Sequence, residues 1–230
     1  MKMTSDLKKC FVEFFGTFFL CFTILCCVLL NTGAGAILNP LIIGLVLAAV
    51  VYAGGPISGA HYNPAVSLGI FLIGRMGSKK TLLYIIFQIF GAAYAALMIL
   101  FLSFAIDKTV TNLSIAPLMI AEIIFTTLLI YVVMFCAVSK RVNGNNYFGF
   151  AIGTSLTVGI AAVGSICLTA FNPAVAVALG LAGVACLKLV LLTILANVIA
   201  AFIACGLFKL LNLDDIEKVE IVGIDEFIRK

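Results

Sequence analysis

The sequence predicts an all-α membrane protein in which six transmembrane helices and two re-entrant half-helices form an inverted repeat. Three observations predict this fold class. Apolar residues make up 64% of the chain, and the mean hydropathy is +1.27. Residues 14–74 carry no formal charge except that of a protonated His61. Two short apolar runs each begin with Asn-Pro-Ala, and the segments around them repeat. A soluble fold has no place to bury this much apolar surface.

The small number of charges excludes several classes of function. The chain has 14 basic and 10 acidic residues, or 10% charged residues, whereas about a quarter is usual in soluble domains. The net charge of +4 is not gathered on a basic face, so we expect no nucleic-acid partner. The eight cysteines lack the CxxC spacing of a metal site. Because no nucleophile–base pair or metal cluster is present, we expect no enzyme, catalytic residue, metal or cofactor.

The spanning segments follow from the lengths of the apolar runs. A helix needs about 20 apolar residues to cross about 30 Å of hydrocarbon. Six runs meet this requirement, and we expect transmembrane helices over residues 10–31, 38–54, 81–105, 117–138, 147–167 and 187–210. Two further runs, 64–74 and 173–183, are too short to cross and are expected to be re-entrant half-helices.

The distribution of lysine and arginine predicts the orientation in the membrane. One side of the predicted topology would collect nine basic residues: Lys2, Lys8, Lys9, Arg75, Lys79, Lys80, Lys140, Arg141 and Lys209. The other side would collect Lys108 and Lys188. Cytoplasmic loops carry the excess of such residues, so both termini are expected in the cytoplasm. The loop 106–116, with the glycosylation pattern Asn112-Leu-Ser114, is then expected outside the cell.

An internal repeat relates the two halves of the chain. The hexapeptide that begins at His61 recurs 109 residues later, starting at Ala170. At the same offset Glu13 matches Glu122, and several further positions match in residue type: Thr17 with Thr126, Gly44 with Gly153, and Gln88 with Asn197. Each half, 10–105 and 117–210, holds three spans and one half-helix. Because three is odd, the second half enters the membrane from the opposite side and the repeat is inverted.

The two Asn-Pro-Ala sequences predict helix starts inside the membrane. Asparagine is a good N-cap, and proline fits the first helical position because it needs no N–H partner there. Inside a bilayer, however, amides and free N–H groups are costly unless they have partners or a role. In an inverted repeat, the half-helices that begin at Pro64 and Pro173 are therefore expected to meet near the midplane with their N-termini facing each other.

These features together resemble the aquaporin (major intrinsic protein) family over about residues 10–210. The resemblance is carried by "FVEFFGTFF" at 11–19, "SGAHYNPAV" at 58–66, "FQIFGAAYAAL" at 87–97, "AEIIFTTLL" at 121–129 and "FNPAVAVALG" at 171–180. It implies a channel domain over 10–210, a cytoplasmic N-terminus over 1–9 and a cytoplasmic tail over 211–230. It also implies a homotetramer in the cell membrane that passes water and small uncharged solutes such as glycerol, hydrogen peroxide or ammonia.

The resemblance also assigns roles to single residues. The pore motifs are Asn63, Pro64, Ala65, Asn172, Pro173 and Ala174. The half-helix dipoles and the two asparagines would repel cations and interrupt proton hopping. Glu13, Glu122 and His61 would brace the re-entrant loops. The selectivity constriction would be formed by Ile43, Ile160, Thr169 and Val175.

The constriction is where this sequence departs from most relatives. Val175 stands where they have an arginine, and Ile160 stands where many strict water channels have a histidine. Ala176 stands where glycerol-conducting relatives usually have an aspartate. Two alternatives stay open at this point. One is a structural or junctional membrane protein with a degenerate pore, and the other is a coupled secondary transporter, because transporters also contain inverted repeats with broken helices.

Overall fold

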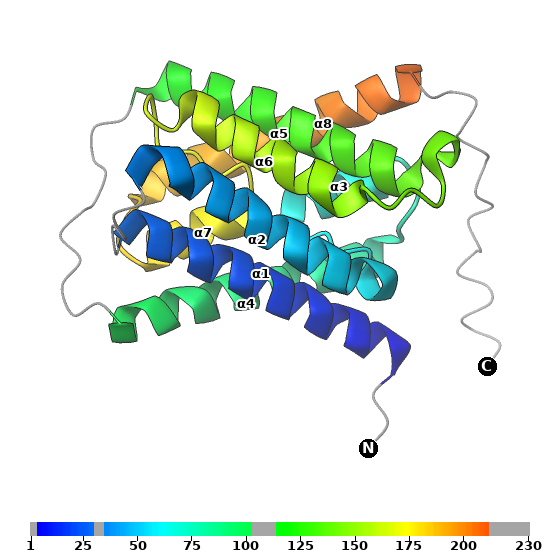
Figure 1. The fold of residues 1–230 in the computed structure, drawn as a ribbon, viewed down its shortest axis with the longest axis horizontal. Coiled ribbons are helices and arrows are strands. Elements are labelled where there is room, and N and C mark those ends of the chain that lie inside the picture. Colours follow the sequence, from blue (N-terminus) through cyan, green and yellow to red (C-terminus); the bar gives the residue numbers. More distant parts are fainter. Residues whose placement is uncertain (1–3, 30–34, 103–113, 212–230) are drawn as a thin grey trace.

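The computed structural model describes residues 4–29, 35–102 and 114–211, and in these ranges the chain is helical without strands (Figure 1). In order, the elements are α1 (Ser5–Leu29), α2 (Gly35–Ser58), α3 (Pro64–Leu72), α4 (Ser78–Leu102), α5 (Ile115–Val138), the short 3₁₀ helix η1 (Lys140–Val142), α6 (Phe148–Val163), α7 (Pro173–Leu181) and α8 (Leu187–Leu211). The expected all-α fold class is confirmed. The calls on Lys2, Lys108, Asn112 and most of the tail 211–230 lie outside the described residues.

Five helices are long and apolar enough to cross a membrane: α1, α2, α4, α5 and α8. The remaining expected span, 147–167, is a helix of only 16 residues, α6. At 1.5 Å per residue it is about 24 Å long. It ends early because the chain leaves the helix after Val163, where the N–H of Gly164 donates to the carbonyl of Ile160, and turns into the loop that leads to α7.

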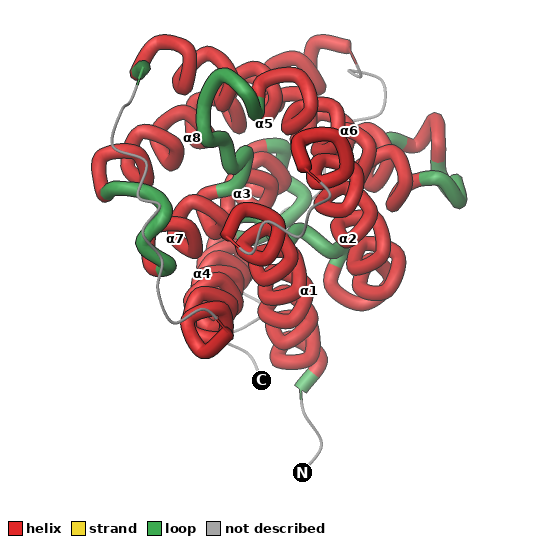
Figure 2. The backbone as a smooth tube through the Cα atoms, turned by 60° about the vertical axis from the view of Figure 1, so that its left-hand side comes forward, coloured by secondary structure: helices red, strands yellow, loops and turns green. Residues whose placement is uncertain are grey.

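The two halves of the chain form two sets of helices with the half-helices between them. Figures 1 and 2 show α1, α2 and α4 on one side, α5, α6 and α8 on the other, and α3 and α7 in the middle. Half-helix α3 packs against α8, α4 and α5, and α7 packs against α4, α8 and α1. The half-helices also contact each other. Each half-helix is therefore held by long helices from both halves.

Small residues let the long helices approach closely. A Cβ atom on Gly153 of α6 would lie 2.3 Å from the carbonyl oxygen of Gly44 in α2. A Cβ atom on Gly91 of α4 would lie 2.4 Å from the carbonyl oxygen of Phe14 in α1. Further small residues expected at helix contacts are buried, namely Ala92, Ala95 and Ala96 in α4 and Ala196, Ala200 and Ala201 in α8, and Ala93 is half-buried. Such close contacts drive helix association in membranes.

The basic residues of the larger predicted group gather at one end of the bundle. The ammonium of Lys209, near the end of α8, donates to the carbonyl of Leu72 at the end of α3 with a distance of 3.1 Å. Arg75 and Lys140 line one cavity. Lys188 stands at the start of α8 and therefore at the opposite end. We call these the basic end and the opposite end of the bundle.

Candidate pore

Each Asn-Pro-Ala motif begins a half-helix, as the sequence predicts. Asn63 has extended backbone angles, and its side-chain Oδ1 accepts a hydrogen bond from the N–H of Ala65 at 2.8 Å. Asn172 accepts in the same way from the N–H of Ala174 at 2.9 Å. Pro64 and Pro173 occupy the first turn. The side-chain oxygen of each asparagine is thus used as an N-cap, and its amide N–H groups point elsewhere.

The amide groups of the two asparagines cross between the halves. Asn63 Nδ2 donates to the carbonyl oxygen of Phe171 at 2.9 Å, and Asn172 Nδ2 donates to the carbonyl oxygen of Tyr62 at 2.9 Å. An asparagine amide has two N–H donors. Each side chain therefore keeps one further N–H for a molecule in the cavity that both asparagines line.

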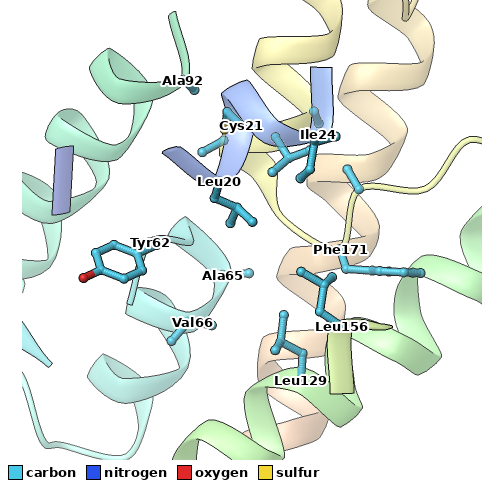
Figure 3. Packing of buried hydrophobic residues seen from close by; sticks show 14 of the residues in the cluster. Leu20, Cys21, Ile24, Tyr62, Ala65, Val66, Ala92, Leu129, Leu156 and Phe171 are labelled. Carbon is cyan, nitrogen blue, oxygen red and sulfur yellow. The ribbon is translucent and has the colours of Figure 1, made fainter. Parts of the chain in front are cut away.

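The residues just before the asparagines have an unusual backbone. Tyr62 and Phe171 have φ of +50° and +51°, in the left-handed region that residues with a Cβ adopt at a cost of about 1 kcal/mol or more. The side chains hold this conformation. The hydroxyl of Tyr62 donates to the carbonyl of Val50, and the ring of Phe171 packs against Phe125 with centroids 5.7 Å apart. Figure 3 shows that the two rings point away from each other, so their carbonyls are left for the crossed asparagines.

A buried carboxylate holds the first loop. Glu13 in α1 accepts hydrogen bonds from Ser58 Oγ at 2.6 Å and from the backbone N–H groups of His61 and Tyr62 at 3.0 and 2.7 Å. It also accepts from Gln88 Nε2 at 2.9 Å. Glu13 is fully buried. Charge-assisted bonds of this kind are the strong ones, so Glu13 ties the loop to α1 and α4.

Glu122 in α5 has the same position in the second half. It accepts from the N–H groups of Ala170 and Phe171 at 2.6 and 3.0 Å and from Asn197 Nδ2 at 2.7 Å. His61 has no histidine counterpart in this half, since the matching residue is Ala170. The Nδ1 atom of His61 lies 3.0 Å from Ser67 Oγ, and His61 also lines the cavity described next.

A narrow central cavity lies between the halves. It gives the centre of a water-sized sphere about 10 Å³, which is close to the least space that one water molecule needs. Its wall is aliphatic apart from the residues of the two loops, and Figure 3 shows part of this wall. The lining residues are Leu20, Ile24, Leu47, His61, Tyr62, Asn63, Val66, Leu129, Val133, Ile152, Leu156, Ala170, Phe171, Asn172 and Val175.

A larger cavity, the apolar vestibule, adjoins the central cavity at the opposite end. It has a volume of about 260 Å³ and shares Ile24, Ala170 and Val175 with the central cavity. All four residues expected at the constriction line it: Ile43, Ile160, Thr169 and Val175. The threonine is the polar member among them. No arginine or lysine is among the residues of this lining.

A third cavity, the basic vestibule, lies at the basic end. It has a volume of about 480 Å³ and shares Ile152 with the central cavity. Gly59 from the first loop, Arg75 and Lys140 are among its lining residues. The three cavities follow one another along the bundle. The geometry is that of one path from end to end, narrowest beside the two asparagines.

Sequence reasoning missed most of the pore wall, although the repeat contains the signal. Apart from Ile152, the residues of the central cavity form pairs 109 positions apart: 20 with 129, 24 with 133, 47 with 156, 61 with 170, 62 with 171, 63 with 172, and 66 with 175. The counterpart of Ile152 is Ile43, which lines the apolar vestibule. Sequence reasoning also gave no role to Ser58 and Tyr84, whose hydroxyl donates to the carbonyl of Ser58. Several expected free carbonyls, including those of Ser58, Tyr62 and Phe171, accept hydrogen bonds from the protein.

Comparison with known proteins gives the family. The family model described as Major intrinsic protein matches residues 1–116. Aquaporin AqpM of Methanothermobacter thermautotrophicus is 32% identical over 202 residues, which cover 75% of this chain and 82% of the relative. The chain belongs to the major intrinsic protein family. A probable aquaporin of the NIP type from Nicotiana alata is 35% identical over 175 residues, covering 73% of this chain and 64% of the relative.

A solved structure supports the fold of this family member. The chain matches the aquaglyceroporin from Plasmodium falciparum with a TM-score of 0.69 and 21% sequence identity, covering 89% of this chain and 96% of that chain. The protein is therefore a multi-pass membrane protein with the aquaporin fold, and its family is one of channels.

Proposed function

We propose that the protein is a passive channel for water and for small uncharged solutes such as glycerol, hydrogen peroxide or ammonia. The observation that carries the proposal is the crossed pair of hydrogen bonds from Asn63 to Phe171 and from Asn172 to Tyr62. It fixes both amides beside a cavity the size of one water. Relatives called aquaporins, over three quarters of this chain, support the same substrate class.

Proton exclusion would come from the two half-helices. Each brings roughly half a positive charge to its N-terminus, and α3 and α7 both begin at the central cavity. A water there accepts N–H bonds from Asn63 and Asn172, so its own hydrogens point outward along the file. This orientation interrupts proton hopping while water still passes, and the dipoles repel cations.

Selection among neutral solutes would occur at the apolar vestibule. The side chains of Ile43, Ile160 and Val175 offer no hydrogen bonds to a solute, and Thr169 offers one hydroxyl. An arginine at position 175 would add five donors and a permanent charge. Without it, the barrier to less polar solutes is lower, and exclusion of cations rests on the half-helix dipoles.

The orientation and assembly are proposed as follows. Residues 10–210 form the channel domain, the segments 1–9 and 211–230 lie in the cytoplasm, and the basic vestibule opens to the cytoplasm. The gathering of Arg75, Lys140 and Lys209 at one end supports this orientation. Four copies form a homotetramer in the cell membrane. Outward-facing apolar side chains on every long helix are available for contact with lipid or with other copies.

The test is stopped-flow light scattering of proteoliposomes under gradients of sucrose, glycerol, urea and ammonium. Water permeability above that of protein-free liposomes is expected, together with passage of at least one neutral solute. Folded protein without permeability would instead support the structural or junctional alternative, and substrate-dependent currents would support coupled transport.

A second measurement addresses proton exclusion. Asn172→Ala removes the amide that donates to Tyr62, and we expect a faster decay of a pH gradient across proteoliposomes. An unchanged decay, at equal water permeability, would contradict the role assigned to the asparagine pair.

A further inference from the structure

The basic vestibule carries charge that water conduction does not require. Arg75 comes from the turn after α3, and Lys140 comes from η1. Lys209 ends α8 beside α3 through its bond to Leu72. These cations come from three different elements. Asp6, Glu13 and Glu122 are the acidic residues in the described part of the chain, and they are not among the residues that line this vestibule.

The chain itself supplies a partner of opposite charge. Residues 212–230, which lie outside the described ranges, contain six acidic and three basic residues. The acidic residues are Asp214, Asp215, Glu217, Glu220, Asp225 and Glu226. The segment follows directly on α8, which ends at Leu211, two residues after Lys209.

The segment is long enough to reach the vestibule. An extended chain spans about 3.3–3.6 Å per residue, so Asp214 can lie up to about 10 Å from Leu211 and Glu226 up to about 50 Å. The last turn of α8 lies against the end of α3, and Arg75 follows α3 by three residues. The first acidic residues can therefore reach the rim of the vestibule without any change in the helices.

We propose that the acidic segment 212–230 binds in the basic vestibule and obstructs the path to the central cavity. Carboxylates pair with guanidinium and ammonium groups by charge-assisted hydrogen bonds. The segment is tethered at the mouth, and a short flexible tether gives an effective concentration on the order of millimolar. The obstruction rests on the proposed function, because it lowers permeability only if the path conducts. The binding does not depend on it.

The first measurement compares the full chain with a chain that ends at Leu211, which keeps every described helix. Osmotic water permeability is measured in proteoliposomes at equal protein content. With a dissociation constant near the effective concentration, about half of the channels are obstructed, so removal of the segment is expected to raise permeability roughly two-fold. A full-length variant with the six acidic residues changed to Asn or Gln is expected to show the same rise.

The second measurement follows binding without conduction. A fluorescent peptide of residues 212–230 is titrated onto the shortened protein in neutral detergent. Binding is expected near millimolar peptide and is expected to be lost in 1 M salt, where the screening length is about 3 Å. The double variant Arg75→Gln, Lys140→Gln should lose binding, whereas Lys188→Gln at the opposite end should keep it. A peptide with neutralised acids should not bind even to the unaltered vestibule, which gives the same test if the double variant does not fold.

The outcomes separate the two proposals. Equal permeability of the full and shortened chains overturns the obstruction. Absent binding, or equal binding to the unaltered protein and the double variant, overturns the docking. If neither chain conducts water, the proposed function is wrong, and the peptide titration still decides whether the segment docks.

Discussion

In the first half of the chain Glu13 accepts four hydrogen bonds, and in the second half Glu122 accepts three. The additional donor is Ser58 of the first loop, whose counterpart 109 residues later is Cys167. His61 and Ser67 are likewise polar, and their counterparts are Ala170 and Ala176. The two loops therefore share the groups that fix the backbone and differ in the groups around them.

The difference follows the two ends of the path. The polar first loop contributes Gly59 to the basic vestibule, and the second loop contributes Thr169 and Ala170 to the apolar vestibule. Glutamate, asparagine and proline match between the halves because each half must hold one re-entrant loop in an apolar medium. Residues that face the two mouths are free of this requirement and have diverged.

The largest expected effect tests the two carboxylates. Glu13→Ala leaves Ser58, Gln88 and two backbone N–H groups without their acceptor, and we expect a loss of at least about 3 kcal/mol in stability. Glu122→Ala orphans fewer donors and is expected to cost less. Thermal unfolding in detergent can be followed with a thiol-reactive dye, since several of the eight cysteines are buried. An equal or smaller loss in Glu13→Ala would contradict the unequal bracing of the loops.

The next effect concerns Val175 and its counterpart Val66, which both line the central cavity. Val175 also lines the apolar vestibule, so Val175→Arg should narrow that mouth and lower the glycerol-to-water permeability ratio about ten-fold, equivalent to about 1.4 kcal/mol in the barrier. The guanidinium needs carbonyl or water partners to be tolerated there. Stopped-flow measurements at matched protein content decide, and an unchanged ratio would show that position 175 is not part of the selectivity filter.

A smaller effect compares the closest helix contacts of the halves. Gly91 in α4 corresponds to Ala200 in α8, so the second half already tolerates a methyl group at this place. In the first half a Cβ would meet the backbone of Phe14 at 2.4 Å, and Gly91→Ala is expected to cost about 2 kcal/mol through overpacking. Gly206→Ala is the control, because no atom lies within 4 Å of its added Cβ. Equal melting temperatures of the two variants would rule out a tighter α1–α4 contact.

The smallest expected effect concerns His61. His61→Ala makes the first loop resemble the second and removes the hydrogen bond with Ser67, which is worth about 1 kcal/mol. The backbone bond from residue 61 to Glu13 remains, so the variant should fold and conduct water. Unfolding and water permeability are measured together. Loss of conduction in a stable variant would show that His61 has a role beyond bracing the loop.

Hydropathy predicted the presence of the helices better than their ends. Helix α1 begins at Ser5, not near residue 10, because Lys8 and Lys9 continue the helix beyond the apolar run. Helix α2 continues to Ser58 through Pro56. Helix α6 is shorter than its apolar run, because residues after Val163 form the loop to α7. Apolar character reports contact with lipid and does not report where backbone hydrogen bonding stops.

The site was predictable where the repeat constrains it. Asn63 and Asn172 could be placed at helix starts from the residue types alone. The crossed bonds to Phe171 and Tyr62 could not, because they depend on how two distant loops approach each other. The roles of the constriction residues remain predictions, although all four line one cavity.

The packing of α3 has a consequence for biosynthesis. Its main partner among the long helices includes α8, the last helix of the chain to be made, and α3 also touches α5 and α7. While the first half is being inserted, α3 has only α4 and its own loop to hold it. Its N-cap asparagine also lacks the Phe171 carbonyl until α7 is in place. The re-entrant shape of the first half is therefore completed late, and a ribosome-stalled chain that ends before α8 should leave residues 64–72 accessible to membrane-impermeant labels.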